Sequence, residues 1–194
     1  MILQAKDLRF SYSKKGACAG GVSLSFTPGR LPWPQRQGKT TCAGCWRAER
    51  PQKGVPDGKP LSAYAGPCPV QMVWQHPETV VDPLLPLGKT LAESGMPEQR
   101  LLDALHIREG WLTRYPGELS GGELQRFCLA RALHPAVKFL LCDESTAMLD
   151  LVTQAQIWDF LLREAASRDL GLLVVSHSAA LLERVCTRTI TLPE

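Results

Sequence analysis

The sequence predicts an α/β fold built around a largely parallel sheet. Short apolar runs recur along the chain, and segments with helical spacing lie between them. Two of these runs, residues 139–142 and 172–175, are continuously apolar, as expected of strands that are buried on both faces of a parallel sheet. The 194 residues, 44% of them hydrophobic, suffice for a sizeable core. We therefore expect one domain over residues 1–194.

Two N-terminal segments are also expected to be strands. Residues 1–12 carry spaced apolar side chains, and apolar residues alternate with serines in residues 20–27, which is the period of a half-buried strand. A turn pattern follows at residues 27–30. Residues 31–60 contain five prolines and no clear period, so we expect irregular structure there.

The rest of the chain alternates between strands and helices. The apolar run 70–74 predicts a short strand, and the proline-punctuated segment 82–86 predicts a loop. Helical spacing predicts helices at 97–106, 121–134, 152–168 and 179–186, and we expect a last strand near 188–192. The residues expected to face inward from these helices are Leu101, Leu102, Leu105, Leu124, Phe127, Cys128, Ile157, Phe160, Leu161 and Ala165.

The composition of the chain indicates where the protein is located and which partners it is expected to bind. The net charge of +3 is small and gives no reason to expect a nucleic-acid partner. No apolar stretch approaches the roughly 20 residues that span a bilayer, and the N-terminus lacks the features of a signal peptide. Seven cysteines, an odd number, suit reduced thiols in a cytosol, and the lone Cys42–Cys45 pair lacks the further ligands that a zinc site needs. We therefore expect a cytoplasmic protein whose membrane contact comes through a partner.

The segment from Ser120 to Glu123 has two interpretations. A serine followed by two glycines at the start of a helix exposes backbone N–H groups, which is an arrangement suited to binding phosphate. The same residues also fit a capping box, in which Ser120 is the N-cap and Glu123 the third helical residue, and that motif needs no ligand. The segment alone leaves both interpretations open.

Asp143 and Glu144 directly follow the apolar run 139–142, and Ser176 and His177 follow the run 172–175. Ligands of α/β proteins bind at the carboxyl ends of such strands. There Asp143 is placed to hold Mg²⁺, and Glu144 to polarise an attacking water. His177 is placed to contact a γ-phosphate, although a lone histidine is more often a structural residue.

Gly38-Lys39-Thr40-Thr41 is a short candidate for phosphate binding. A lysine neutralises β- and γ-phosphates, and a threonine hydroxyl ligates Mg²⁺. A second Gly-Lys-Thr, at residues 88–90, follows the proline-punctuated loop and leads into no similar pattern, so we assign it no phosphate-binding role.

In this order and spacing, the motifs resemble those of the ABC ATPase family over nearly the whole chain. Gly38-Lys39-Thr40-Thr41 is similar to the end of the Walker A loop. Asp143 and Glu144 are similar to the Walker B aspartate and the catalytic glutamate. Ser120-Gly121-Gly122-Glu123 resembles the signature motif, which in the family contacts the γ-phosphate bound to the opposite subunit.

Four further positions extend the resemblance. Tyr12 lies where the family places an aromatic residue on adenine, and Leu149-Asp150 is similar to the end of the D-loop. Gln75 resembles the Q-loop glutamine, which touches Mg²⁺ and couples to the membrane subunit, and His177 resembles the switch histidine. Residues 115–118 and 154–157 are similar to the peptide and nickel importer branch.

The resemblance implies a P-loop NTPase core with a mainly parallel sheet, antiparallel N-terminal strands and a helical signature subdomain over about residues 88–135. The implied cofactors are ATP and Mg²⁺, with Thr40, Gln75 and Asp143 as candidate Mg²⁺ ligands. The implied partners are a second ABC ATPase subunit, in a homo- or heterodimer, and membrane permease subunits. Such a subunit powers the import of peptides, nickel or similar small solutes from the cytoplasmic face of the membrane.

Residues 31–58 depart from the family pattern. A P-loop needs a glycine five residues before Gly38, but Trp33 stands there between two prolines, which remove backbone N–H donors. Codons for residues 31–37 and 42–48, read one base out of frame, permit peptides similar to the family sequence. We hypothesise that this degenerate region carries compensating frameshifts.

Two alternatives to an active transport ATPase follow. The chain is a degenerate subunit that completes a partner's ATP site without turnover of its own, or it is a soluble ABC ATPase outside transport. Relatives of the second kind usually carry two cassettes or long insertions, and this chain has one compact cassette.

Overall fold

The computed structural model describes residues 3–10, 19–26, 54–56 and 66–186. Within these ranges, the strands form two three-stranded sheets, one parallel and one antiparallel, and the helices follow the parallel strands along the chain. The candidate residues Tyr12, Gly38, Lys39, Thr40 and Thr41 lie outside the described residues, as do Trp33, the CxxC pair and the strand expected near 188–192.

The parallel sheet has the order β4-β5-β6 and consists of β4 (Val70–Val73), β5 (Phe139–Asp143) and β6 (Gly171–Val175). Every residue of β5 is buried, because β5 is the central strand. This confirms the expectation drawn from the apolar run 139–142. The same expectation for the run 172–175 is wrong in part, because only Val174 of β6 is buried and the other residues of that strand are partly exposed. At the start of β6, a Cβ on Gly171 would lie 2.6 Å from the Phe139 ring, so only glycine lets the two strands approach this closely.

The antiparallel sheet has the order β2-β1-β3 and contains β1 (Leu3–Phe10), β2 (Ala19–Phe26) and β3 (Gly54–Pro56). The first two strands confirm the expectation from the N-terminal pattern. Strand β3 corrects the expectation that residues 31–60 are irregular throughout. Three residues with a glycine and a proline show no alternation, so nothing local predicts this edge strand.

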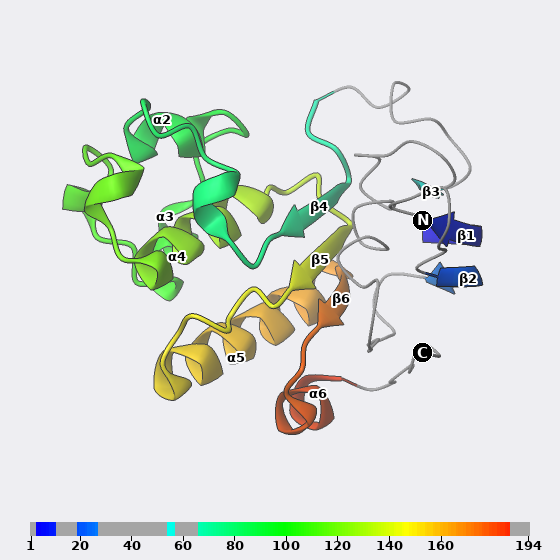
Figure 1. Cartoon of the computed structure of the whole chain (residues 1–194). Coiled ribbons are helices and arrows are strands. Elements are labelled where there is room, and N and C mark those ends of the chain that lie inside the picture. Colours follow the sequence, from blue (N-terminus) through cyan, green and yellow to red (C-terminus); the bar gives the residue numbers. More distant parts are fainter. Residues whose placement is uncertain (1–2, 11–18, 27–53, 57–65, 187–194) are drawn as a thin grey trace.

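The helices are α2 (Leu87–Ala92), α3 (Gln99–Ala104), α4 (Gly121–Ala132), α5 (Leu151–Arg168) and α6 (Ala179–Val185). Short 3-10 turns occur at η2 (Pro77–Thr79), η3 (Glu109–Trp111) and η4 (Pro116–Glu118). Helices α2, α3 and α4 gather on the left of the parallel sheet in Figure 1, and α5 runs below it. Helix α2 was not expected. Its six residues are too few to show a helical period, and they contain the second Gly-Lys-Thr, whose Thr90 is buried.

One hydrophobic core joins these helices to β5 and β6. The side chains expected to face inward are buried, except that Ala165 is only partly buried. Trp158, which was not expected inside, is also buried, and Trp111 packs against Phe127 with ring centroids 6.2 Å apart. The described cysteines carry free thiols, and burial raises the pKa of Cys142 to about 12.

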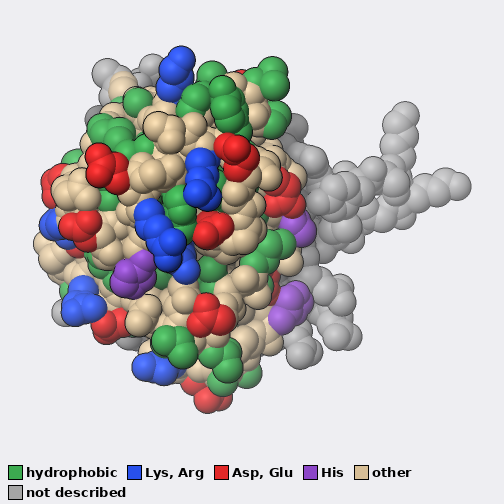
Figure 2. Space-filling model, turned by 90° about the vertical axis from the view of Figure 1, so that its left-hand side faces the viewer, with side chains coloured by type: hydrophobic (Ala, Val, Ile, Leu, Met, Phe, Trp, Pro, Cys, Tyr) green, Lys and Arg blue, Asp and Glu red, His purple; other side chains and the backbone are tan. Residues whose placement is uncertain are grey.

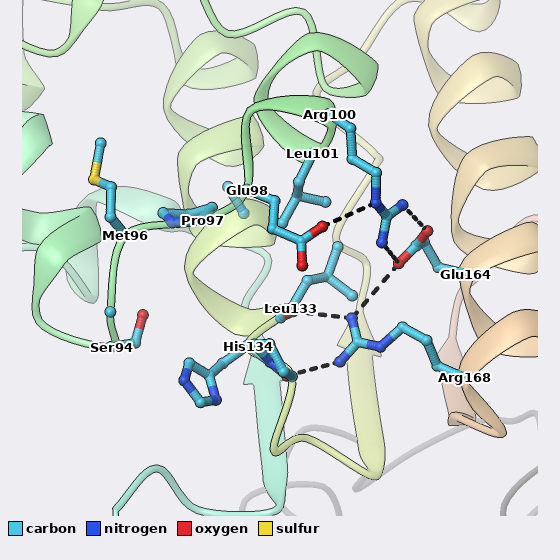
Figure 3. Close-up of a pocket in the computed structure, with 13 residues that line it drawn as sticks. Ser94, Met96, Pro97, Glu98, Arg100, Leu101, Leu133, His134, Glu164 and Arg168 are labelled. Atoms are coloured by element: carbon cyan, nitrogen blue, oxygen red, sulfur yellow. Dashed lines mark hydrogen bonds and ion pairs between the residues drawn. The ribbon is translucent and has the colours of Figure 1, made fainter.

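Glu164 of α5, whose side chain is only 7% exposed, links α5 to α3. Arg100 of α3 forms a bidentate ion pair with Glu164. Arg168 lies 3.6 Å from the same carboxylate and donates to the backbone oxygens of Leu133 and His134 at 3.0 and 2.8 Å (Figure 3). The hydrogen bond from Arg100 lowers the pKa of Glu164 despite burial.

The outer face over these helices is mixed in charge. In Figure 2, Lys and Arg side chains alternate with Asp and Glu side chains across this face, and apolar side chains lie between them. No helix in the described ranges combines the length and the apolar character that crossing a bilayer requires.

We predict that Glu164→Gln destabilises the chain at pH 7 by about 1–2 kcal/mol, because it weakens two charged hydrogen bonds at a buried site. The pKa of Glu164 is lower in the folded state than in the unfolded state. The ionised carboxylate therefore stabilises the fold fully at pH values above the unfolded-state pKa, and this stabilisation is lost as the pH falls through the folded-state pKa. Urea unfolding from pH 7 down to pH 3 should therefore show the difference from wild type shrinking. Glu183→Gln, at an exposed position of α6, is the control. A difference in unfolding free energy between wild type and Glu164→Gln that does not change with pH would contradict the stabilising role of the ionised carboxylate.

Candidate functional site

The carboxyl ends of β5 and β6 form one edge that carries the acidic candidates. Asp143 is the last residue of β5, pairs with Val175 of β6 and is 2% exposed. Glu144 follows it with a φ of 46°, in the left-handed region that a non-glycine residue rarely adopts. The Glu144 amide donates to the Val175 oxygen at 2.9 Å, and this bond holds the turn in place. Such backbone strain often marks a functional position.

The residues after β6 meet Glu144 from the neighbouring strand. His177 Nε2 lies 3.6 Å from Glu144 Oε1, an ion-pair distance if the imidazole is protonated but too long for a normal hydrogen bond. The Ser176 hydroxyl donates to Glu144 Oε2 at 3.4 Å and accepts from the Ser178 amide at 3.2 Å. The Glu144 side chain is 12% exposed and that of His177 is 78% exposed. The carboxylate is therefore held inside, whereas the imidazole reaches outward.

Ser176 had no predicted role. The only available indication was its place beside His177 at the end of an apolar run. The structure shows that this serine is 4% exposed and orients the Glu144 carboxylate from the side.

The loop that follows Glu144 is fixed onto α5 by Thr146. The Thr146 hydroxyl accepts hydrogen bonds from Trp158 Nε1 at 3.0 Å and Gln154 Nε2 at 2.9 Å, and Gln154 also donates to the Thr146 backbone oxygen. Asp150 ends the loop as the N-cap of α5 and accepts from the amides of Val152 and Thr153. Hydrogen bonds from Thr153 lower the pKa of Asp150.

Helix α4 begins at a capping box, which is one of the two interpretations that the sequence left open. The Ser120 hydroxyl accepts from the Glu123 amide at 3.3 Å, and Glu123 Oε2 accepts from the Ser120 amide at 2.8 Å. The Ser120 backbone N–H lowers the pKa of Glu123. A Cβ on Gly121 would lie 3.2 Å from Met148 Sδ, and one on Gly122 would lie 3.0 Å from Leu149 Cδ2. The two glycines thus let the start of α4 pack against the loop after Glu144.

Gln75 lies at the same edge of the sheet as the acidic residues. It follows β4 by two residues, is exposed, and β4 pairs in parallel with β5 so that Val73 faces Cys142. Trp74, between β4 and Gln75, accepts a hydrogen bond at its backbone oxygen from Gln125 of α4 at 2.8 Å. Gln125 was not among the candidates from sequence.

The residues at this edge fit a magnesium ion bound together with phosphate. Asp143 and Glu144 offer carboxylate oxygens, which are the ligands that Mg²⁺ prefers, and Ser145 adds a buried hydroxyl. Among the described residues, no group of three or more His, Cys, Asp or Glu is arranged so that it could hold a metal ion. Magnesium in phosphate-binding sites typically uses only one or two carboxylates plus phosphate and water.

A separate cavity of about 360 Å³ lies beside the Arg100–Glu164–Arg168 group. None of the residues at the β5–β6 edge lines it. Its two arginines already donate to Glu164 or to backbone oxygens, as Figure 3 shows, so we assign it no part in the site.

Comparisons with known proteins agree on one family. The sequence model of the ABC transporter family matches residues 38–147. The nickel import ATP-binding protein NikE of Rhodospirillum rubrum is 37% identical over 64% of this chain and 50% of its own length, so the chain spans half of that relative. The methionine import ATP-binding protein MetN of Thermobifida fusca is 34% identical over 95% of this chain and 65% of its own length. A NikE from Staphylococcus aureus is 26% identical over the whole chain and 87% of its own length.

Solved structures share the fold. The cbiO1 protein of Clostridium perfringens, described as part of the ABC transporter complex cbiONQ, superposes with a TM-score of 0.73 at 19% identity and covers 98% of this chain. The ATP-binding cassette MJ0796, solved as a dimer with ADP and Pi, gives 0.77 at 20% identity over the same share. The chain, with the signature-like start of α4, the acidic end of β5 and the histidine after β6, belongs to the ABC transporter family of ATP-binding cassette proteins.

Proposed function

We propose that the chain is the ATP-binding and ATP-hydrolysing subunit of an ABC importer. The observation that carries the proposal is the convergence of Asp143, Glu144 and His177 at adjacent strand ends. The similarity to nickel and methionine import proteins supports import of a small solute. Residues 115–118 and 154–157 are similar to the peptide and nickel importer branch, which favours peptides, nickel or a similar solute as the imported molecule.

The buried edge of the sheet suits in-line attack by water on a γ-phosphate. Bound Mg²⁺, held by Asp143 with Thr40 and Gln75, would offset phosphate charge. Glu144 orients the attacking water and accepts its proton, while Ser176 and the Val175 oxygen fix its side chain and backbone. His177 reaches outward to the γ-phosphate. Lys39 neutralises phosphate charge and Tyr12 stacks on adenine, as the resemblance implies.

In the proposed dimer, the start of α4 contributes to the nucleotide site of the other subunit. Ser120, Gly121, Gly122 and Glu123 face the nucleotide of a second cassette subunit, and the helix N-terminus favours its phosphates. A dimeric solved relative supports such a pair. Permease subunits would hold the dimer at the cytoplasmic face of the membrane, where nucleotide-driven closure moves them.

A second candidate function, completion of a partner's ATP site, is favoured by the P-loop region. The family match begins at Gly38 and so omits Trp33, where the P-loop needs glycine. In this alternative, residues 31–58 fail to cradle phosphate, and the chain completes a partner's site through Ser120–Glu123 without turnover of its own.

We predict that purified chain binds MgATP with a micromolar Kd and that Lys39→Ala weakens binding at least about ten-fold, because it removes the phosphate-neutralising charge. Isothermal titration measures both. Lys138→Ala, between the α4 region and β5, is the control and should bind as wild type does. No binding up to millimolar ATP would reject the active subunit and favour the second candidate.

We predict that Glu144→Gln lowers steady-state ATP turnover by about 10²–10⁴-fold while ATP affinity changes little, because the amide cannot accept a proton. A phosphate-release assay measures turnover, and Glu109→Gln, exposed on η3, is the control. Unchanged turnover in Glu144→Gln would remove Glu144 from the chemistry.

A further inference from the structure

Gln125 of helix α4 binds the chain just before Gln75, at the start of the segment that carries this residue. Gln125 Nε2 donates to the Trp74 backbone oxygen at 2.8 Å, although the two residues are 51 positions apart in sequence. Gln125 is 2% exposed and lies among the buried apolar residues of α4. Burying an amide is costly unless it is hydrogen-bonded, so an apolar residue would suit this position better if packing were its only role.

The same helix holds the other end of the segment through Arg131. Arg131 Nη2 donates to the Val80 backbone oxygen at 2.8 Å, and Nη1 lies 3.5 Å from Glu93 Oε2. The Arg131 side chain is 24% exposed, so the guanidinium is partly shielded from water where it meets Val80. Residues 125 and 131 stand about 9 Å apart along the helix axis.

Between these two contacts, residues 75–79 form a compact loop with its own hydrogen bonds. The Thr79 amide and hydroxyl both donate to the His76 oxygen, at 3.2 and 2.7 Å, and the Val80 amide donates to the Pro77 oxygen at 3.2 Å. Pro77 is buried against the rest of the fold. The two ends of this internally bonded loop are therefore attached to one helix.

We propose that Gln125 and Arg131 are positioning residues, which set where Gln75 lies relative to the start of α4. The proposal rests on the proposed function, in which Gln75 takes part in the nucleotide site. Helix α4 carries Ser120 at its N-terminus and contacts Met148 and Leu149 through its glycines. A displacement of that end is therefore transmitted along the rigid helix to the loop that carries Gln75.

Hydrogen–deuterium exchange of the full chain tests the attachment without nucleotide. Gln125→Met and Arg131→Met remove the two donors and keep side chains of similar length. We expect amide exchange of Thr79 and Val80 to rise at least about ten-fold in each variant. Amides of β5 and α5 should stay within about two-fold of wild type. Gln156→Met and Arg163→Met, at exposed positions of α5, are the matched controls.

Either of two exchange results would overturn the proposal. Unchanged exchange at Thr79 and Val80 would show that the two side chains do not hold the loop. A uniform rise that includes β5 and α5 would show general destabilisation in place of local positioning. Because no nucleotide is present, both results are independent of whether the chain hydrolyses ATP.

Steady-state kinetics tests the consequence for the site. Gln125→Met should lower kcat about ten-fold and leave KM for ATP within about two-fold, since a displaced Gln75 impairs the hydrolysis step more than ATP binding. Arg131→Lys, which still offers a donor to the Val80 oxygen, should recover more of kcat than Arg131→Met. A raised KM at unchanged kcat would contradict the positioning role. Absence of turnover in wild type would reject the proposed function, and the exchange experiment would still decide the attachment.

Discussion

The pairing of β5 with β6 is the constraint on which the site depends. Parallel pairing brings Asp143 level with Val175, so the residues that follow the two strands leave the sheet at the same edge. The Glu144 amide bonds the Val175 oxygen, and the Ser176 hydroxyl bonds the Glu144 carboxylate. The register depends in turn on buried apolar contacts, including the close approach of Gly171 to Phe139. A slip by one residue would exchange the two faces of the strand and separate the acidic residues from His177.

Helix α4 links the remaining parts of the site to that edge. Its start is a capping box whose glycines pack on the loop after Glu144, and its middle and end bond the backbone on both sides of Gln75. Thr146 fixes the same loop to α5 from the other direction. The candidate residues are therefore held by a network of side-chain hydrogen bonds in addition to packing, and such a network makes the site more rigid.

Features of this structure that depend on neighbouring residues could be predicted from the sequence, and those that depend on distant residues could not. Strands β5 and β6 are continuous apolar runs, so both were predictable. The capping box from Ser120 to Glu123 spans only four residues, so the sequence could offer it as one of two interpretations. Helix α2 and strand β3 are too short to show a period. The bonds from Gln125 to Trp74 and from Arg100 to Glu164 join residues 51 and 64 positions apart, and such partners become visible only once the chain has folded.

The proposed function requires that the carboxyl edge of β5 and β6 binds the metal–nucleotide complex. Paramagnetic NMR can locate the metal, with Mn²⁺ in place of Mg²⁺ and ATP in excess. We expect Mn²⁺ with ATP to broaden the backbone amide resonances of Asp143, Glu144 and His177 and to leave those of Glu164 and Arg168 sharp. Broadening at Glu164 and Arg168 with sharp resonances at Asp143 and Glu144 would place the metal at another site and would rule out this edge.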